Sequence, residues 1–483
     1  MLKKTKTFLT SAFLFLVSHS SSAAIQVPDG SRIAFAFKEP GSESVASYHG
    51  DTFMTPASTE KVLTALAAML YFGPDWQFKT KLLVQQGSLQ DGHVRGDVIV
   101  KFDGAPDLTR QSLVNLLAFL KQQKITQIDG NILLDISGYA GYDHGDGSSW
   151  SDLPVCFTAP ASAVVVDRNC VYAQLNATQL GRFAEPIIPA GQPITITSEA
   201  LVVSQQEYYS GCELRVDMNT ANNYHLSGCI PQQSTPWPLS LSISDPTAWG
   251  VDLITWAAAK AGLSVAGQVK AVRHVPDNLT ELAHVPSAPL NKLMDRMLKR
   301  SDNLYADSLA RALGHYYLSR VGNYASGADA VRLILKNKAG IDLGSAMIVD
   351  GSGLSAHDLI TPKQMLAVLE YIALHDKELG IIDLLPVAGV SGTLGSRGSV
   401  QNKPLVRNVT AKTGTLQNVS NLAGFMTTAS GKRKAFVLMA NGLTFPPNIR
   451  SLLKAHKIAS PHYKFERAIL EQIYYERPIE ITE

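Results

Sequence analysis

Residues 54–70 read Met54-Thr-Pro-Ala-Ser58-Thr-Glu-Lys61-Val-Leu-Thr-Ala-Leu-Ala-Ala-Met-Leu70. The second half of this stretch is rich in Ala, Leu and Met at helical spacing, which predicts a buried helix. Pro56 is a helix-start signal, so we expect Ser58 on the first turn of that helix. At that position, free backbone N–H groups and the positive end of the helix dipole favour a developing negative charge.

Lys61 follows Ser58 by three residues, so both side chains are expected on one face of the helix. A serine hydroxyl is a poor nucleophile until a base removes its proton, and a lysine can be that base when burial and neighbouring cations lower its pKa. The alternative is a capping serine beside a solvated lysine. A second copy of the pattern, Ser451-Leu-Leu-Lys454, lacks the apolar helix and shows that the pattern alone does not decide.

A second motif, Ser301-Asp302-Asn303, follows an amphipathic helical pattern over 290–300 and precedes another over 304–313. It is therefore expected at a break between two helices, where side chains point into a cleft. Ser301 is a candidate proton relay to a leaving group. Asn303 is a candidate hydrogen-bond partner of Lys61 and of a substrate amide. The alternative is an N-cap for the second helix, and both roles are compatible.

The third motif, Lys412-Thr413-Gly414, lies in a predicted strand over 408–416, and 421–428 and 433–440 predict two further strands of an antiparallel meander. Because Gly414 has no side chain, a substrate backbone is expected to lie along this strand edge. Lys412, Thr413 and Thr415 are candidates for binding a terminal carboxylate. The N–H groups of Thr415 and Ser58 are candidates for an oxyanion hole. The alternative is an ordinary edge strand with a solvated lysine.

The three motifs in this order form a serine acyl-transfer signature. They resemble those of the penicilloyl-serine transferases, the penicillin-binding proteins and serine β-lactamases. The likeness is closer to the low-molecular-mass class C penicillin-binding proteins of peptidase family S13, and within them to the type-4 D-alanyl-D-alanine carboxypeptidase/endopeptidases. It rests on five segments, which are Pro56-Ala-Ser-Thr-Glu-Lys61, Lys299-Arg-Ser-Asp-Asn303, Asp350-Gly-Ser-Gly-Leu-Ser355, Leu385-Pro-Val-Ala-Gly389 and Ala411-Lys-Thr-Gly414.

This resemblance implies an α/β (α+β) fold of the β-lactamase/transpeptidase type, with an antiparallel sheet flanked by helices. The long stretch between Lys61 and Ser301 far exceeds a helix connection, and the likeness implies an insert of two small domains there. We expect catalytic segments over 25–80 and 285–483 around an insert over 81–284. The resemblance also implies hydrolysis of peptidoglycan stem peptides and cross-links through an acyl-serine, acylation by β-lactams, and no cofactor or metal.

The same likeness nominates Asp152, Phe157 and Gln417 for a pocket that holds the amino end of a diaminopimelate side chain. A carboxylate and an aromatic face suit an ammonium group. The alternative for Asp152 is a loop residue that caps a turn. Where close relatives can carry an arginine after Gly-Leu-Ser, this chain has Ala356.

The N-terminus combines Lys3, Lys4 and Lys6 with an apolar run over 8–17 and a small-residue cleavage site ending at Ala24, which predicts a secretory signal peptide over 1–24 and a periplasmic protein. The run is too short for a spanning helix, so at most loose membrane association is expected. Cleavage removes three lysines and no acid, so the formal net charge falls from +2 to −1. Nothing in this charge pattern indicates nucleic-acid binding.

Four cysteines, Cys156, Cys170, Cys212 and Cys229, all lie in the expected insert. An even number in an exported chain predicts disulfides. Three pairings are possible, and we expect the two local ones, Cys156–Cys170 and Cys212–Cys229. No cysteine pair has C-x-x-C spacing and no H-E-x-x-H motif occurs, so the sequence does not indicate a metal site.

Two other functions are consistent with the motifs. A serine β-lactamase shares all three, but it needs rapid deacylation, and the chain has no E-x-x-L-N segment of the class A kind. A non-catalytic scaffold that binds the cell wall would retain the fold. The intact Ser58–Lys61 pair argues against a scaffold, which has no need of a base beside that serine.

Overall fold

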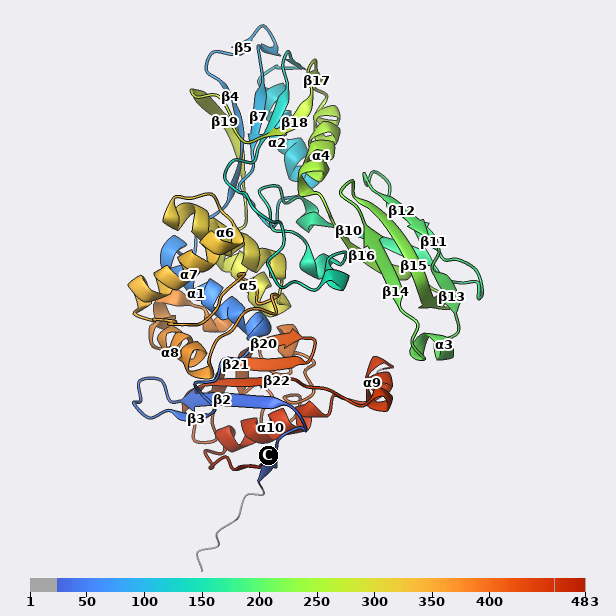
Figure 1. Ribbon diagram of the computed structural model, residues 1–483. Coiled ribbons are helices and arrows are strands. Elements are labelled where there is room, and N and C mark those ends of the chain that lie inside the picture. The colour runs from blue at the N-terminus through green and yellow to red at the C-terminus, as the bar shows by residue number, and fades with distance from the viewer. Residues whose placement is uncertain (1–23, 456, 483) are drawn as a thin grey trace, which may run out of the picture.

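A computed structural model describes residues 24–455 and 457–482. Figure 1 shows a sheet near the C-terminus, a group of helices next to it, one further lobe at the far end from the sheet and a second lobe to the side of the helical group. The expected signal peptide lies outside the described residues except for Ala24.

The principal sheet is antiparallel and has the order β20-β21-β22-β2-β3. Its strands are β2 (Arg32–Lys38), β3 (Ala46–Tyr48), β20 (Val409–Leu416), β21 (Val419–Thr427) and β22 (Arg433–Asn441). The predicted meander is therefore present, and the strand that carries Lys412 is an edge strand. Alternation along the strands gives the sheet two apolar faces.

One face of this sheet packs against α10 (His462–Tyr474), whose Phe465 and Ile469 share a core with Phe35 and Leu422. The other face packs against α8 (Pro362–Leu379). Helix α8 begins with a capping box at Thr361 and ends before Gly380, which adopts a left-handed conformation. Such start and stop signals set the length of a helix independently of its packing.

Helix α1 (Lys61–Phe72) lies at the centre of the helical group and is buried from Val62 to Met69. It packs against four helices, which are α5 (Leu290–Arg300), α6 (Asn303–Leu318), α7 (Tyr324–Ala339) and α8. Its composition explains this placement, because a helix that is apolar on all sides has to be covered on all sides. The start of α1 consequently cannot move without disturbing the core.

A first inserted lobe is built on a mixed sheet of order β18-β9-β7-β4-β19, onto which α2 and α4 pack (Figure 1). Its elements are β4 (Lys79–Gln85), β7 (Val98–Lys101), α2 (Arg110–Gln122), β9 (Ile132–Asp135), α4 (Pro246–Ala261), β18 (Val269–Val272) and β19 (Leu279–Pro286). Four short strands form a second sheet at its edge, namely β5 (Leu89–Gln90), β6 (His93–Val94), β8 (Gln127–Ile128) and β17 (Ser264–Val265).

A second inserted lobe is almost entirely β structure and has its own apolar core, which includes Leu175, Tyr224 and Leu241. Its elements are β10 (Cys170–Asn176), β11 (Glu185–Ile187), β12 (Thr195–Ser198), β13 (Leu201–Val203), α3 (Gln205–Tyr209), β14 (Leu214–Met218), β15 (Asn223–Pro231) and β16 (Trp237–Ser242). Disulfides join Cys156 to Cys170 and Cys212 to Cys229, which are the two local pairs.

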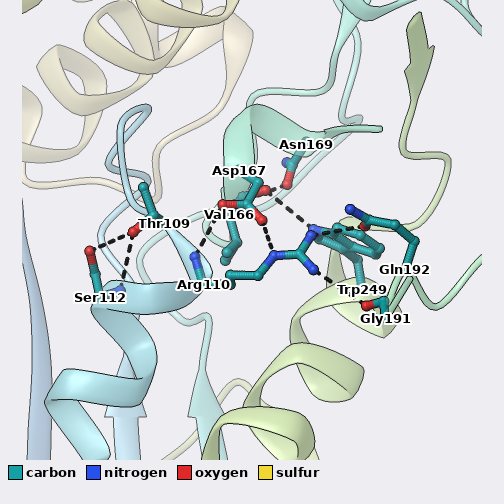
Figure 2. A network of polar contacts seen from close by, with 9 residues as sticks. All are labelled: Thr109, Arg110, Ser112, Val166, Asp167, Asn169, Gly191, Gln192 and Trp249. Atoms are coloured by element: carbon teal, nitrogen blue, oxygen red, sulfur yellow. Dashed lines mark hydrogen bonds and ion pairs between the residues drawn. The ribbon is translucent and has the colours of Figure 1, made fainter. Parts of the chain in front are cut away.

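Figure 2 shows the polar contacts that join the two inserted lobes. Arg110, the first residue of α2, forms an ion pair with Asp167 and donates to the Gln192 side chain at 2.8 Å. The indole N–H of Trp249 on α4 donates to the Val166 carbonyl at 3.2 Å. These contacts tie the first lobe to the segment that enters the second lobe.

The remaining elements lie at the termini and in loops. Strand β1 (Ile25–Gln26) pairs in parallel with β23 (Ile481–Thr482), and α9 (Pro447–Lys454) follows the principal sheet. The short 3-10 turns are η1 (Ala57–Glu60), η2 (Trp150–Asp152), η3 (Cys156–Thr158), η4 (Asp167–Asn169), η5 (Ile382–Leu384) and η6 (Gly392–Leu394). Over residues 24–455 and 457–482, no helix has both the length and the apolar character needed to cross a bilayer.

Candidate active site

Ser58 lies on the 3-10 turn η1, immediately before α1 begins at Lys61. The expectation of a first α-helical turn is thus corrected to a tighter turn in the same place. Two buried asparagines hold the segment before it, because Asn421 donates to the carbonyls of Thr55 and Pro56 at 2.9 and 2.8 Å, and Asn441 accepts from the Thr55 N–H. The serine is therefore anchored to both the principal sheet and the helical group.

The Lys61 ammonium is completely buried and donates to three oxygens. These are Ser58 Oγ at 2.9 Å, Asn303 Oδ1 at 2.6 Å and the Ser352 carbonyl at 2.6 Å. Burial lowers the pKa of Lys61 from 10.5 to about 8, against the opposing effect of carboxylates such as Asp307 and Asp350. A lysine with this pKa has a substantial neutral fraction near neutral pH and is competent as a base toward Ser58.

The Ser301-Asp302-Asn303 motif occupies the break between α5 and α6, as expected. Ser301 ends α5 in a left-handed conformation (φ 56°), and Asn303 is the first residue of α6. The Asn303 side-chain amide makes two hydrogen bonds: its Oδ1 accepts from Lys61, and its Nδ2 donates to the Phe157 carbonyl at 2.8 Å.

Asp302 occupies the N-cap position of α6 without a side-chain cap bond. Its carboxylate instead pairs with Arg168 at 2.8 Å and Arg296 at 2.9 Å. The predicted alternative, an ordinary capping residue, is therefore only half right. The buried Asp302 carboxylate therefore joins the start of α6 both to α5, through Arg296, and to the segment before the second lobe, through Arg168.

Lys412 is also completely buried and donates to Ser301 Oγ at 2.7 Å and to the Thr413 carbonyl at 2.9 Å. Burial, followed by the positive charges of Lys61 and Arg397, lowers the pKa of Lys412 well below its usual value. The alternative of a solvated edge-strand lysine is excluded by this burial. Ser301 thus lies between α5 and the ammonium of Lys412, in a position suited to passing a proton.

The outer edge of β20 leaves backbone groups free next to Ser58. Within this strand, the Ala411 N–H points away from β21, because it donates to the Pro386 carbonyl. Alternation in an antiparallel pair then directs the N–H groups of Thr413 and Thr415 outward as well. Thr415 is exposed and lines the same cavity as Ser58. The Thr413 hydroxyl donates to Thr393 Oγ1 at 2.8 Å.

Gly414 has a reason for being glycine beyond the one expected. A Cβ at this position would lie 2.5 Å from the Pro56 carbonyl oxygen and 3.2 Å from the Thr59 nitrogen. The missing side chain therefore allows η1 to pack on β20, and the expected substrate backbone along this strand edge stays a prediction. Because Gly414 has no side chain, the η1 turn that carries Ser58 can lie directly against β20.

A cavity of about 440 Å³ opens beside Ser58. Its wall brings together the three residues expected around a diaminopimelate side chain, Asp152, Phe157 and Gln417, together with Ala356. The remaining lining residues are Thr55, Gly147, Ser149, Thr158, Asn303, Leu354, Thr415, Leu416 and Val419. The first inserted lobe's connection to the second, over 147–158, therefore supplies one wall, and the β20–β21 turn supplies the opposite one.

The second serine–lysine pattern has no such surroundings. Ser451 is exposed on α9, and its hydroxyl donates to the Pro447 carbonyl of its own helix at 3.0 Å. The Ser451 hydroxyl proton is thus given to a backbone carbonyl rather than to a base.

Several residues of the site were not expected from their own chemistry. The Ser352 carbonyl binds Lys61, Thr393 binds Thr413, and Asn421 fixes the helix start. Segment 350–355 was noted only because it resembles a segment of the family. The sequence analysis assigned no function to its residues. Every residue has a backbone carbonyl, so the amino-acid type at position 352 does not predict that its carbonyl binds Lys61.

The family model of the D-Ala-D-Ala carboxypeptidase 3 (S13) family matches residues 18–456. The chain belongs to this family. It is 38% identical to the D-alanyl-D-alanine carboxypeptidase DacB of Haemophilus influenzae, over 98% of this chain and 100% of that protein. It is 25% identical to the D-alanyl-D-alanine carboxypeptidase of Actinomadura, over 84% of this chain and 76% of that protein.

Among solved structures, the chain is similar to penicillin-binding protein 4 of H. influenzae, with a TM-score of 0.86 and 39% identity over 93% of this chain and 97% of that one. The same protein complexed with a β-lactam gives a TM-score of 0.81. These comparisons confirm the family, the mixed α/β fold of the transpeptidase type and the assignment as a serine hydrolase of the carboxypeptidase family.

Proposed function

We propose that the chain is a periplasmic serine D-alanyl-D-alanine carboxypeptidase and DD-endopeptidase that acts through an acyl-serine on peptidoglycan peptides. The observation that carries the proposal is the Ser58–Lys61–Asn303 arrangement, in which a buried lysine of lowered pKa lies 2.9 Å from an otherwise unactivated hydroxyl. Family membership supports the substrate class.

The reaction begins when neutral Lys61 takes the Ser58 proton and Oγ attacks the carbonyl carbon of the terminal D-Ala–D-Ala bond. The carbonyl π bond becomes an oxyanion, which two backbone N–H groups, those of Ser58 and Thr415, stabilise. Collapse of this intermediate breaks the C–N bond. Ser301, hydrogen-bonded to Lys412, passes on to the departing amine the proton that Lys61 took up, which leaves Lys61 neutral again.

Water then attacks the acyl-serine ester; neutral Lys61 takes its proton and returns a proton to Ser58 Oγ as the C–O bond breaks, which releases the shortened peptide and restores the free enzyme. A cross-link between D-Ala and diaminopimelate has the same D-Ala carbonyl with a different amine, so the same steps cleave it. A β-lactam follows the first half-reaction and stays attached, because its leaving amine remains tethered. The β-lactam complex of the H. influenzae relative supports this part of the proposal.

Substrate orientation comes from both ends of the site. Lys412, Thr413 and Thr415 are assigned to the terminal carboxylate, because they gather cationic and hydroxyl groups at the strand edge. Asp152, Phe157 and Gln417 are assigned to the amino end of the diaminopimelate side chain, because one carboxylate, one half-exposed ring and one amide line the same cavity. We divide the chain into a signal peptide over 1–24, a catalytic unit over 25–80 and 285–483, and an insert over 81–284.

The proposal is tested with purified muropeptides and labelled penicillin. The wild-type protein is expected to release D-Ala from monomeric pentapeptide, to cleave D-Ala–diaminopimelate dimers, and to be labelled covalently. Ser58→Ala should remain folded and lose all three. Labelling of Ser58→Ala would refute the assignment of the nucleophile, whereas release of D-Ala without dimer cleavage would remove the endopeptidase activity.

Asp152→Asn tests the side-chain pocket separately. It removes the carboxylate and keeps the shape, so we expect peptides with a free side-chain amine to lose about tenfold in kcat/KM, as for one charge-assisted contact. Penicillin, which has no such amine, serves as the control and should acylate Ser58 at the wild-type rate. Equal kinetics on the amine-bearing peptides would remove Asp152 from the site.

A further inference from the structure

Four buried carboxyl groups lie behind Lys61, and the reaction described above uses none of them. They are Glu60, Asp307, Asp350 and Asp358, with exposed fractions of 2%, 6%, 3% and 0%. One carboxyl oxygen from each of Glu60, Asp350 and Asp358 lies within 4.8 Å of the others. Among the described residues, the hydrogen bonds of the Lys61 ammonium go to Ser58, Asn303 and Ser352, and none goes to a carboxylate.

Asp350 accepts three hydrogen bonds from backbone N–H groups, more than any of the other three. Its Oδ1 accepts from the backbone N–H groups of Ser352 at 2.8 Å and Gly353 at 2.6 Å, and its Oδ2 accepts from the N–H of Ser355 at 2.8 Å. One side chain thereby folds residues 350–355 into a compact turn, because three backbone donors converge on two oxygens.

Glu60 and Asp358 form a separate pair. Burial, followed by the charges of Asp358 and Asp350, raises the pKa of Glu60 well above its usual value. Burial, followed by the charge of Asp350, likewise raises the pKa of Asp358 well above its usual value. Asp358 also accepts from the Val349 N–H at 2.6 Å, whereas Asp350 is the carboxylate that accepts from three backbone N–H groups of the turn.

The turn is also held from outside. The Gly351 N–H donates to Asp307 on α6 at 2.9 Å, and its carbonyl accepts from the Thr64 hydroxyl on α1 at 2.6 Å. A Cβ at Gly353 would lie 1.9 Å from the Ala57 carbonyl oxygen, so the turn packs directly against η1. The turn therefore touches both elements that carry the reacting pair.

The Ser352 carbonyl projects from this turn onto Lys61 Nζ at 2.6 Å. A neutral lysine has two N–H bonds and one lone pair. If Asn303 and the Ser352 carbonyl accept the two N–H bonds, the lone pair is directed at the remaining partner, Ser58 Oγ. Losing the carbonyl would free the amine to rotate and would lower the population aligned for proton transfer.

We propose that Asp350 is a positioning residue for the general base, and that it acts by folding the 350–355 turn so that the Ser352 carbonyl orients the Lys61 amine toward Ser58. The assignment rests on the proposed function, because it presumes Lys61 as the base. It adds a residue that touches neither the substrate nor the reacting atoms.

The test separates the first-order acylation constant from the dissociation constant of the non-covalent penicillin complex, using saturation kinetics. Asp350→Asn keeps one acceptor oxygen and is expected to lower the acylation constant about tenfold. Asp350→Ala keeps none and is expected to lower it about 100-fold, within the range of a positioned base. The dissociation constant should stay within about twofold of wild type in both variants. Asp103→Asn is the matched control. Asp103 is also a buried carboxylate, but it accepts from Tyr316 and belongs to none of the three motifs, so this variant should be acylated at the wild-type rate.

Thr64→Val provides a second route if the Asp350 variants do not fold. It removes the hydroxyl that holds the Gly351 carbonyl and keeps the shape, so we expect an acylation constant about threefold lower with unchanged binding. A folded Asp350 variant, or Thr64→Val, with the wild-type acylation constant would overturn the proposal. So would a loss confined to the dissociation constant. A failure of the proposed function itself can be told apart from a failure of this inference, because it would appear as covalent labelling of the Ser58→Ala variant with Asp350 and Thr64 unchanged.

Discussion

Asn303→Asp is the most direct test of Lys61 as the base, because it changes one atom next to the amine. Asn303 Oδ1 lies 2.6 Å from Lys61 Nζ. With a pKa of about 8, about 10% of Lys61 is neutral at pH 7. A carboxylate in place of the amide puts an opposite charge in contact with the ammonium, which raises a lysine pKa by roughly 1–3 units.

A rise of about two units would reduce the neutral fraction at pH 7 to about 0.1% and slow acylation about 100-fold, equivalent to about 2.7 kcal/mol. Acylation needs the neutral amine, so its rate increases with pH through the Lys61 pKa. The ascending limb should therefore move from near pH 8 to near pH 10, and most of the lost rate should return in alkaline buffer. The variant also loses the amide donor to the Phe157 carbonyl, which costs about 1–3 kcal/mol of stability.

Stopped-flow measurement of acylation by a fluorescent penicillin between pH 6 and pH 10.5 gives the ascending limb of the pH–rate profile directly. Asn303→Ala removes the same contact without adding charge, so its limb should stay near pH 8 even if its plateau falls. An Asn303→Asp limb that coincides with the wild-type limb would refute the reasoning, because a neutral-lysine base cannot be indifferent to a carboxylate in contact with it.

Three further outcomes follow from the geometry. Arg397→Met leaves Glu466 buried without its ion-pair partner at 2.5 Å, and should lower the free energy of unfolding by about 3–5 kcal/mol in urea titrations; a loss below about 1 kcal/mol would contradict this. Gly414→Ala places a Cβ 2.5 Å from a carbonyl oxygen of the helix start, and should abolish most penicillin labelling while costing about 1–3 kcal/mol; normal labelling would show that η1 can move. Replacing both cysteines of Cys212–Cys229, a bridge with a sequence separation of 17, should destabilise the second lobe by about 3 kcal/mol in calorimetry and leave penicillin labelling unchanged, with reduced labelling as the contrary result.

Much of the local structure was predictable from the sequence. The helix over 290–300 and the strands around Lys412 begin and end within a few residues of their expected positions. They were predictable because apolar periodicity and turn residues act over a few neighbouring positions. Ser58 shows the limit of such signals, since its turn is 3-10 rather than α-helical.

The chemical roles were less evenly predictable. Ser58 and Lys61 are three residues apart, so a helical spacing alone brings them together. That Gly414 makes room for η1 was not predictable, because the backbone nearest to a strand depends on which segment folds over it. The contact between Asp302 and Arg168 spans a separation of 134 residues, which no local pattern encodes.

The amino-acid sequence by itself determined the pair that we propose as the reacting groups, the order of the three motifs and the segments that carry them, since each depends on side-chain type and short-range spacing. Only the tertiary structure decided that Lys61 and Lys412 are both fully buried, which strand edge faces Ser58, and that the Ser352 carbonyl completes the environment of the base. The physical reason is that burial and backbone contacts arise from packing between elements hundreds of residues apart. The pKa of Lys61 is lowered by what surrounds it, and these surroundings come from the whole fold.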